Sequence, residues 1–183
     1  MSDGATISAV GKTLDRHKYK NPDQSVYKAK RGLTREVVED ISYQKSEPDW
    51  MREFRLKSFE VFQAKPLPTW GPDLSGIPFD ELTYYIRPTD QVAPTWEDLP
   101  QDIKDTFDKL KIPEAEQKYL SGVVAMYDSE TVYKSLQRPW EKQGVLFCDM
   151  DTAVREHPEL VREYFMKKCI PPHDNKFSAL HGA

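Results

Sequence analysis

Cysteine and histidine, the side chains that hold most protein metals, are scarce in this sequence. Two cysteines and four histidines occur among 183 residues. Two thiols make no disulfide framework, and they do not supply the two tight ligand pairs that structural zinc sites usually show. The composition therefore argues against both a disulfide-stapled fold and a structural zinc module.

Motifs of catalysis are missing as well. The sequence contains neither a glycine-rich Walker loop for phosphates nor a G-x-S-x-G nucleophile turn. Carboxylates that lie close together in the sequence fall mostly at predicted helix starts, where they interact favourably with the helix dipole. We therefore predict no catalytic residue, no ATP site and no enzyme activity.

Long apolar runs are also absent. No stretch approaches the roughly 18–20 apolar residues that a membrane span needs, and the N-terminus lacks the apolar centre of a secretory signal. The charged fraction of 31% indicates a heavily solvated surface. We expect a cytoplasmic protein without a membrane segment, whose two cysteines are free thiols.

Charge is unevenly distributed along the chain. Residues 1–31 carry seven Lys or Arg and three acidic residues, whereas the remainder carries 19 basic and 27 acidic residues. An acidic body does not attract nucleic acid, because neutralising phosphates needs clustered cations. The pattern predicts a flexible basic arm over residues 1–31, followed by one domain over residues 32–183, with no nucleic-acid partner.

Regular structure is predicted to begin at Thr34. Its hydroxyl suits an N-cap, and Leu33 and Val38 occupy the two positions of a hydrophobic staple. This helix should fade near Ser46. Pro48 then suits the first position of a second helix, where its missing N–H costs nothing.

The second helix carries large apolar side chains on more than one face. Such a wide stripe predicts a helix covered on two sides, although an exposed groove for a partner is the alternative. Arg52 and Arg55 flank this stripe, and we expect both on a solvated edge. The aromatic and apolar positions concerned are Trp50, Met51, Phe54 and Phe62.

Four prolines between residues 66 and 78 predict an irregular stretch, with Trp70 packed as its anchor. Residues 82–86 are rich in β-formers and end before Pro88, so they predict a strand. Tyr84 and Tyr85 would then face opposite sides of it, which leaves one of them exposed.

Helices are predicted for much of the central part of the chain. Asp98 suits the N-cap of one that places Ile103, Phe107 and Leu110 on a single face. A second is predicted from Pro113 to Leu120, with Gly122 as its stop. The remaining one would begin at a Ser129 cap and carry Val132, Tyr133, Leu136 and Trp140.

The last forty residues predict a strand and three short helices. Residues 145–148 form an apolar run between Gly144 and Asp149, which is typical of a buried strand. Asp151, Pro158 and Asp174 are the expected helix starts. Together the elements predict an α+β fold that is predominantly helical.

Four side chains remain as metal-ligand candidates: Cys148, Cys169, His173 and His181. Only Cys169 and His173 lie close in sequence, at C-x3-H spacing. Cys148 falls in the predicted strand, where a cysteine usually acts as a small core hydrophobe. We therefore predict no metal, cofactor-binding or catalytic site in this chain.

Several segments, taken in their order along the chain, are similar to those of the SufB family of iron–sulfur cluster assembly scaffold proteins. The similarity covers residues 31–183. The segments are Gly32–Val38, Glu47–Met51, Arg55–Lys57, Trp70–Leu74, Tyr84–Tyr85, Ile112–Glu116, Tyr127–Tyr133, Gly144–Phe147, His157–Leu160 and Asp174–Leu180.

This resemblance implies a fold larger than the present sequence. It makes the chain the N-terminal, mainly helical region of a longer protein, in which a right-handed parallel β-helix would follow. It also implies membership of a SufBCD-type scaffold, with SufD-like and SufC-like (ATPase) proteins and sulfur-donor proteins as partners.

The resemblance implies a structural or docking role for this segment. The family's cysteine, histidine and glutamate positions for sulfur handling have no counterpart here, so no functional residue is carried over. A transient iron–sulfur cluster belongs to the full-length protein, and two cysteines are too few to hold one alone. The alternative is a stand-alone helical protein-interaction module unrelated to cluster assembly.

Overall fold

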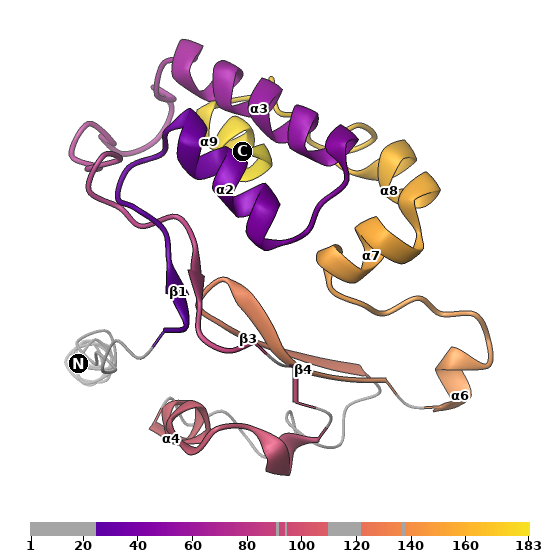
Figure 1. Cartoon of the computed structure of the whole chain (residues 1–183). Helices are drawn as coiled ribbons and strands as arrows, with labels where there is room; N and C mark the ends of the chain where they lie inside the picture. Colours follow the sequence, from indigo (N-terminus) through magenta and orange to yellow (C-terminus); the bar gives the residue numbers. More distant parts are fainter. Residues whose placement is uncertain (1–24, 91, 94, 110–121, 137) are drawn as a thin grey trace, which may run out of the picture.

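The computed structural model describes residues 25–90, 92–93, 95–109, 122–136 and 138–183. Helices and two small antiparallel sheets make up the fold, so the expected α+β class is confirmed. In Figure 1 the helices α2 (Arg35–Gln44), α3 (Asp49–Ala64) and α9 (Lys176–Gly182) lie together at the top. The hairpin of β3 (Gly122–Tyr127) and β4 (Glu130–Leu136) lies below them. No helix among the described residues is long and apolar enough to cross a membrane. The parallel β-helix that the resemblance implies in a longer protein stays a prediction.

The helical layer consists of α2 (Arg35–Gln44), α3 (Asp49–Ala64) and α9 (Lys176–Gly182). Thr34 caps α2 as predicted, because its hydroxyl oxygen accepts a hydrogen bond from the Val37 N–H at 3.3 Å. The structure corrects the start of α3 by one residue. Pro48 is the N-cap of α3 rather than its first helical residue. The core of this layer comprises Val38, Phe59, Phe62, Ala179 and Ala183.

Helix α9 has only seven residues, so its stability depends on packing. Its N-cap is Asn175, whose side chain accepts hydrogen bonds from two backbone N–H groups; the sequence predicted Asp174 in that place. Its last residue is Gly182, where an added Cβ would lie 2.7 Å from the Ser58 hydroxyl oxygen. The absence of a side chain at Gly182 therefore lets α9 approach α3 closely.

The first sheet corrects two predictions. Strand β1 (Tyr27–Lys28) pairs antiparallel with β2 (Ile86–Arg87), so the strand predicted over residues 82–86 is shifted toward the C-terminus. Ordered structure also begins before residue 32. Ala29, which belongs to the arm predicted over residues 1–31, is buried. For residues 1–24, which lie outside the described residues, the flexible arm remains a prediction.

The helix predicted from Ser129 is wrong: this region is a β-hairpin. Strand β3 (Gly122–Tyr127) pairs with β4 (Glu130–Leu136) through a two-residue turn. Asp128 in that turn adopts φ of 51°, a left-handed conformation that aspartate tolerates better than most residues. The short helix α6 (Arg138–Glu141) lies beyond β4. Gly122 begins β3, and the helix that it was predicted to end lies outside the described residues.

A second core lies between the hairpin and the segment before it. The 3-10 helix η2 (Trp96–Asp98) and helix α4 (Gln101–Lys109) precede β3. Asp98 lies within η2 and accepts a hydrogen bond from the Thr95 hydroxyl, so it does not cap α4 as predicted. Leu110 and the helix predicted over residues 113–120 lie outside the described residues. This core contains Ala93, Leu99, Ile103, Ala125, Val132 and Tyr133.

The C-terminal part contains α7 (Met150–Glu156) and α8 (Pro158–Tyr164). Pro158 begins α8 as predicted, but the N-cap of α7 is Asp149 rather than Asp151. Val154 and Val161 pack with Met51 of α3 in a third cluster. These contacts attach the two short helices to the helical layer.

Two predictions of burial fail. Residues 145–148 form no strand, and Val145, Leu146 and Phe147 are exposed instead of buried. Trp70 is 74% exposed, so it does not anchor the proline-rich loop. Apolar composition alone predicted burial in both places, but the described residues provide no cover there.

Candidate functional site

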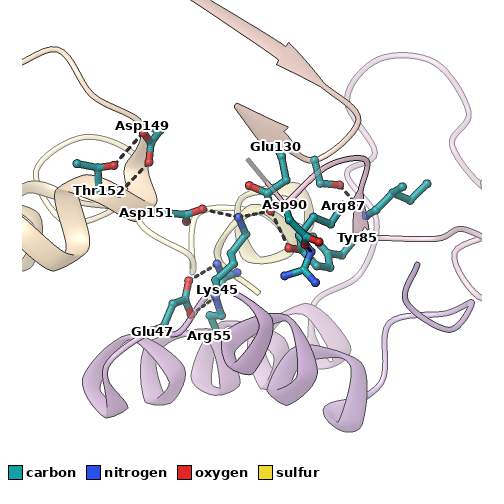
Figure 2. Close-up of polar contacts among 12 residues, drawn as sticks. Lys45, Glu47, Arg55, Tyr85, Arg87, Asp90, Glu130, Asp149, Asp151 and Thr152 are labelled. Carbon is teal, nitrogen blue, oxygen red and sulfur yellow. Dashed lines mark hydrogen bonds and ion pairs between the residues drawn. The ribbon is translucent and has the colours of Figure 1, made fainter. Parts of the chain in front are cut away.

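Lys45 lies at the centre of the largest polar cluster that joins separate elements of the described fold. It follows the last turn of α2, and only 12% of its side chain is exposed. Its ammonium group donates to Glu130 of β4 at 3.0 Å and to Asp151 of α7 at 2.7 Å. Figure 2 shows Lys45 between these two carboxylates. One cation thus connects the helical layer, the hairpin and α7.

Tyr85 completes this cluster from the segment just before β2. Its ring is buried, and its hydroxyl donates to Glu130 at 2.6 Å. The Lys45 ammonium lies 5.3 Å from the centre of the same ring, within the range of a cation–π contact. We call Lys45, Tyr85, Glu130 and Asp151 the lysine cluster.

The cluster shifts the pKa of two of its members. Burial lowers the pKa of Lys45, but the hydrogen bonds and negative charges of Asp151 and Glu130 outweigh burial and hold that pKa above its ordinary value. Burial, and then the hydrogen bond to Glu130, raises the pKa of Tyr85 well above the ordinary value. Both shifts favour a protonated lysine and a neutral tyrosine at neutral pH.

A recess of about 390 Å³ adjoins the lysine cluster. Arg87 and Asp90 form an ion pair at 3.3 Å on its wall; the Arg87 Nε atom is buried and the contact lacks hydrogen-bond geometry. The acids and bases of the recess largely compensate one another, and its lining contains no cysteine or histidine. The lining residues are Gln44, Lys45, Ser46, Tyr85, Arg87, Thr89, Asp90, Val92, Glu130, Thr131, Asp151 and Arg155.

A second buried ion pair closes the turn between α2 and α3. The Arg55 guanidinium donates to both carboxylate oxygens of Glu47, at 2.7 and 2.6 Å, and to the main-chain oxygen of Ala183 at 3.0 Å. The Glu47 side chain is 3% exposed and that of Arg55 is 15% exposed. Arg55 is therefore not on a solvated edge as predicted, whereas Arg52 is more exposed and pairs with Asp49.

Asp149 connects the start of α7 to the hairpin. Its carboxylate accepts hydrogen bonds from the Thr152 N–H and hydroxyl, and it lies 3.5 Å from the Lys134 ammonium of β4. Burial raises the pKa of Asp149, but these Thr152 hydrogen bonds and the Lys134 charge together hold it below the ordinary value. This contact gives α7 a second polar link to β4.

The four metal-ligand candidates stay apart from this network. Cys148 is half-buried in a loop, not in a strand, and Cys169, His173 and His181 are exposed. Within the described ranges, no three His, Cys, Asp or Glu side chains gather as a metal site would require. The prediction that the chain has no metal, cofactor or catalytic site stays a prediction.

The apolar stripe of α3 is mostly core. Met51 and Phe62 are buried, and Phe54 packs against Phe165 with ring centres 5.5 Å apart. Trp50 is half-buried beneath the Arg162 guanidinium, which lies 4.5 Å from its ring centre. The interpretation of this stripe as core is confirmed. On the following strand segment, Tyr85 is buried and Tyr84 is partly exposed, as their alternation predicted.

Sequence reasoning missed the lysine cluster because its members lie far apart along the chain. Lys45 is separated from Glu130 by 85 positions and from Asp151 by 106. Periodicity and capping rules report contacts within a few residues, so neither can place these three side chains together. Only the tertiary arrangement reveals the network.

The sequence is similar to proteins of known assignment. No family model matches the chain. It is 50% identical over 165 residues to the iron–sulfur cluster assembly protein SufB of Bacillus subtilis strain 168. It is 48% identical over 165 residues to SufBD family proteins of Staphylococcus aureus strain USA300 and Staphylococcus epidermidis.

The aligned region covers 90% of this chain but 35% of each of these relatives, so the chain spans about a third of their length. The alignment extends through nearly all of the present sequence, which excludes a match confined to one motif. Over this region the chain is therefore similar to the SufB and SufBD family proteins of iron–sulfur cluster assembly.

Proposed function

We propose that this chain acts in iron–sulfur cluster assembly as a non-catalytic structural and docking domain of a SufB-like scaffold. The observation that carries the proposal is the 50% identity to Bacillus subtilis SufB over 90% of the chain. In a SufB-like protein this domain would precede a parallel β-helix.

The chemistry of the described residues supports a structural role. The side chains of Lys45, Glu47 and Arg55 are at most 15% exposed, and all three are engaged in ion pairs. Groups held in this way resist rearrangement, since removing one partner leaves an uncompensated charge inside the fold.

The partners follow from the family and not from any contact seen here. The proposed scaffold binds a SufD-like protein and a SufC-like ATPase, and it receives sulfur from sulfur-donor proteins. The iron–sulfur cluster is the cargo of the full-length scaffold. Cys148 and Cys169 sit on different segments, and neither has the neighbouring thiolates that a cluster requires.

A chimaeric scaffold tests this proposal. In it, the present chain replaces the matching 165 residues of Bacillus subtilis SufB, in cells depleted of their own SufB. We expect the chimaera to restore growth and the activity of iron–sulfur enzymes. A variant with Cys148→Ser and Cys169→Ser should restore both equally well, because neither thiol has a role in the chemistry.

Two results would contradict the proposal. A stably produced chimaera that fails to restore iron–sulfur enzymes would favour a stand-alone interaction module. A chimaera that restores them only when both cysteines are present would show that this domain takes part in sulfur or cluster chemistry.

A further inference from the structure

The connection between α6 and α7 exposes a continuous apolar run. Val145 is 46%, Leu146 55% and Phe147 40% exposed. Elsewhere among the described residues, no three consecutive large apolar side chains are exposed in this way. Trp140 and Met150, just outside the run, are exposed to similar degrees. Contiguous apolar surface of this kind marks an interaction site.

The main chain of this run is also open. The Val145 N–H donates to the Trp140 carbonyl at 3.2 Å. Across the described ranges, no hydrogen bond engages the main chain of Leu146, Phe147 or Cys148. In Figure 1 the α6–α7 connection runs along the outer side of the molecule, at the right of the view. Unpaired N–H and C=O groups in an apolar segment are a template for strand pairing.

The composition of the run suits a strand. Val145 and Phe147 are residue types enriched in strands, whereas Gly144 before them, at φ of 80°, and the Asp149 cap after them set its limits. A partner strand would form hydrogen bonds with the open main-chain groups of this run. Pockets on the sheet of the partner strand would receive every second side chain of the run. The segment thus has both features of a β-augmentation site.

The length of the relatives indicates what covers this run. The alignment accounts for 35% of Bacillus subtilis SufB, so about two thirds of that protein has no counterpart in the present chain. A strand in the same polypeptide reaches the run at a high effective concentration, which a second molecule lacks. We propose that Val145–Cys148 is an edge strand that pairs with a β-strand from the unmatched part of the full-length family protein.

Hydrogen exchange resolved to single amides tests this pairing. In the present chain, the amides of Leu146 to Cys148 should exchange as fast as in an unstructured peptide. At the aligned positions of intact Bacillus subtilis SufB they should exchange at least about 100-fold more slowly, because ladder hydrogen bonds must open first. The exposed turn before Pro171 serves as the control, and its exchange should be alike in both proteins.

Fast exchange at the aligned positions of intact SufB would overturn the proposal. Slow exchange in the present chain by itself would overturn it too, since either self-association or another segment of the chain would then cover the run. These exchange measurements test one interface, and they depend on the proposed function only through the sequence similarity to SufB. A failure here therefore leaves the proposed role in cluster assembly untouched.

Matched variants of the chimaeric scaffold provide a second measurement. Leu146→Asp should raise the exchange rates of the neighbouring amides at least about tenfold, because a buried charge opposes the pairing. Ile170→Asp, at a side chain that is also more than half exposed, should leave these rates unchanged. Equal behaviour of the two variants would contradict the proposal.

Discussion

The helical layer and the hairpin region are stabilised by different kinds of contact. This difference determines how much of each region the sequence predicts. In the helical layer, caps such as Thr34 and Asn175 lie within three residues of the groups they satisfy. In the hairpin region, Val132 becomes buried only when β4 pairs with β3 and covers α4 and η2. Local chemistry defines the first region, and long-range pairing defines the second.

Few polar contacts connect these two regions. The Lys45–Glu130 ion pair is one of them. The first sheet adds an indirect link, because the Ile86 N–H of β2 donates to the Ser129 hydroxyl at 3.0 Å. Because the hairpin shares no apolar cluster with the helical layer, these contacts carry much of the connection.

The largest effect is expected inside the helical layer, from Arg55→Ala. It leaves the Glu47 carboxylate buried without its cation, which should cost about 4 kcal/mol of unfolding free energy. Arg52→Ala removes an exposed pair on the same helix and should cost about 0.5 kcal/mol. Urea unfolding of both variants measures the difference. Equal losses of unfolding free energy would mean that the Glu47–Arg55 ion pair does not stabilise the turn between α2 and α3.

Lys45→Met tests the connection between the two regions. Glu130 and Asp151 would lose a charged hydrogen-bond donor, so we expect a loss of about 2 to 3 kcal/mol. Arg35→Met, which breaks an exposed pair with Glu39 in the same helix, should cost about 0.4 kcal/mol. Amide exchange in β4 should also accelerate in the Lys45 variant. If the exchange of β4 does not change, the cluster does not couple the regions.

Val132→Ala tests the hairpin core. Val132 is fully buried, and its truncation should cost about 2 kcal/mol through lost burial and the cavity left behind. Val124→Ala, on the neighbouring strand and 37% exposed, should cost less than about half as much. Thermal unfolding compares the two. The reverse ranking would contradict the observed register of β3 and β4.

Gly182→Ala tests the close approach of α9 to α3. The new Cβ would lie 2.7 Å from the Ser58 hydroxyl oxygen, so overpacking should cost about 1.5 kcal/mol. Gly76→Ala meets nothing within 4 Å and should be close to neutral. Urea midpoints for the two variants provide the measurement. A neutral Gly182 variant would show that the helices separate readily.

The smallest effect concerns alkaline pH. Raised pKa values of Lys45 and Tyr85 mean that the folded chain holds these protons more tightly than the unfolded chain does. Their contribution is therefore complete below pH of about 10 and declines as pH rises toward the folded pKa values. Tyr85→Phe should flatten this decline, whereas Tyr43→Phe, at an exposed ring, should leave it unchanged. Unfolding curves between neutral and alkaline pH provide the measurement. The same pH dependence of stability in both variants would contradict this explanation.

Sequence reasoning located the elements whose signals are local. It placed the start of α2 at the Thr34 cap and its end within two residues, found α3 and α8 from their prolines, and identified the α3 stripe as core. These successes share one cause, because cap, proline and periodic apolar residues act on neighbours in the chain. The family resemblance, read from short segments in order, also proved correct.

The failures have a physical cause as well. Residues 129–136 satisfy a helical spacing of apolar positions, yet their β-branched and aromatic residues and the Asp128–Ser129 turn favour a hairpin. For residues 145–148, composition indicates a strand but not whether a partner strand exists. The lysine cluster needs three distant elements together, and no local signal contains that information.

Reconstitution of the present chain with iron and sulfide tests most directly whether this domain contributes structure and not cluster chemistry. We predict that the desalted protein retains no iron and stays colourless, since two cysteines are too few for a cluster and no three ligating side chains gather among the described residues. A stable coloured species that disappears when both cysteines are replaced by serine would contradict the account.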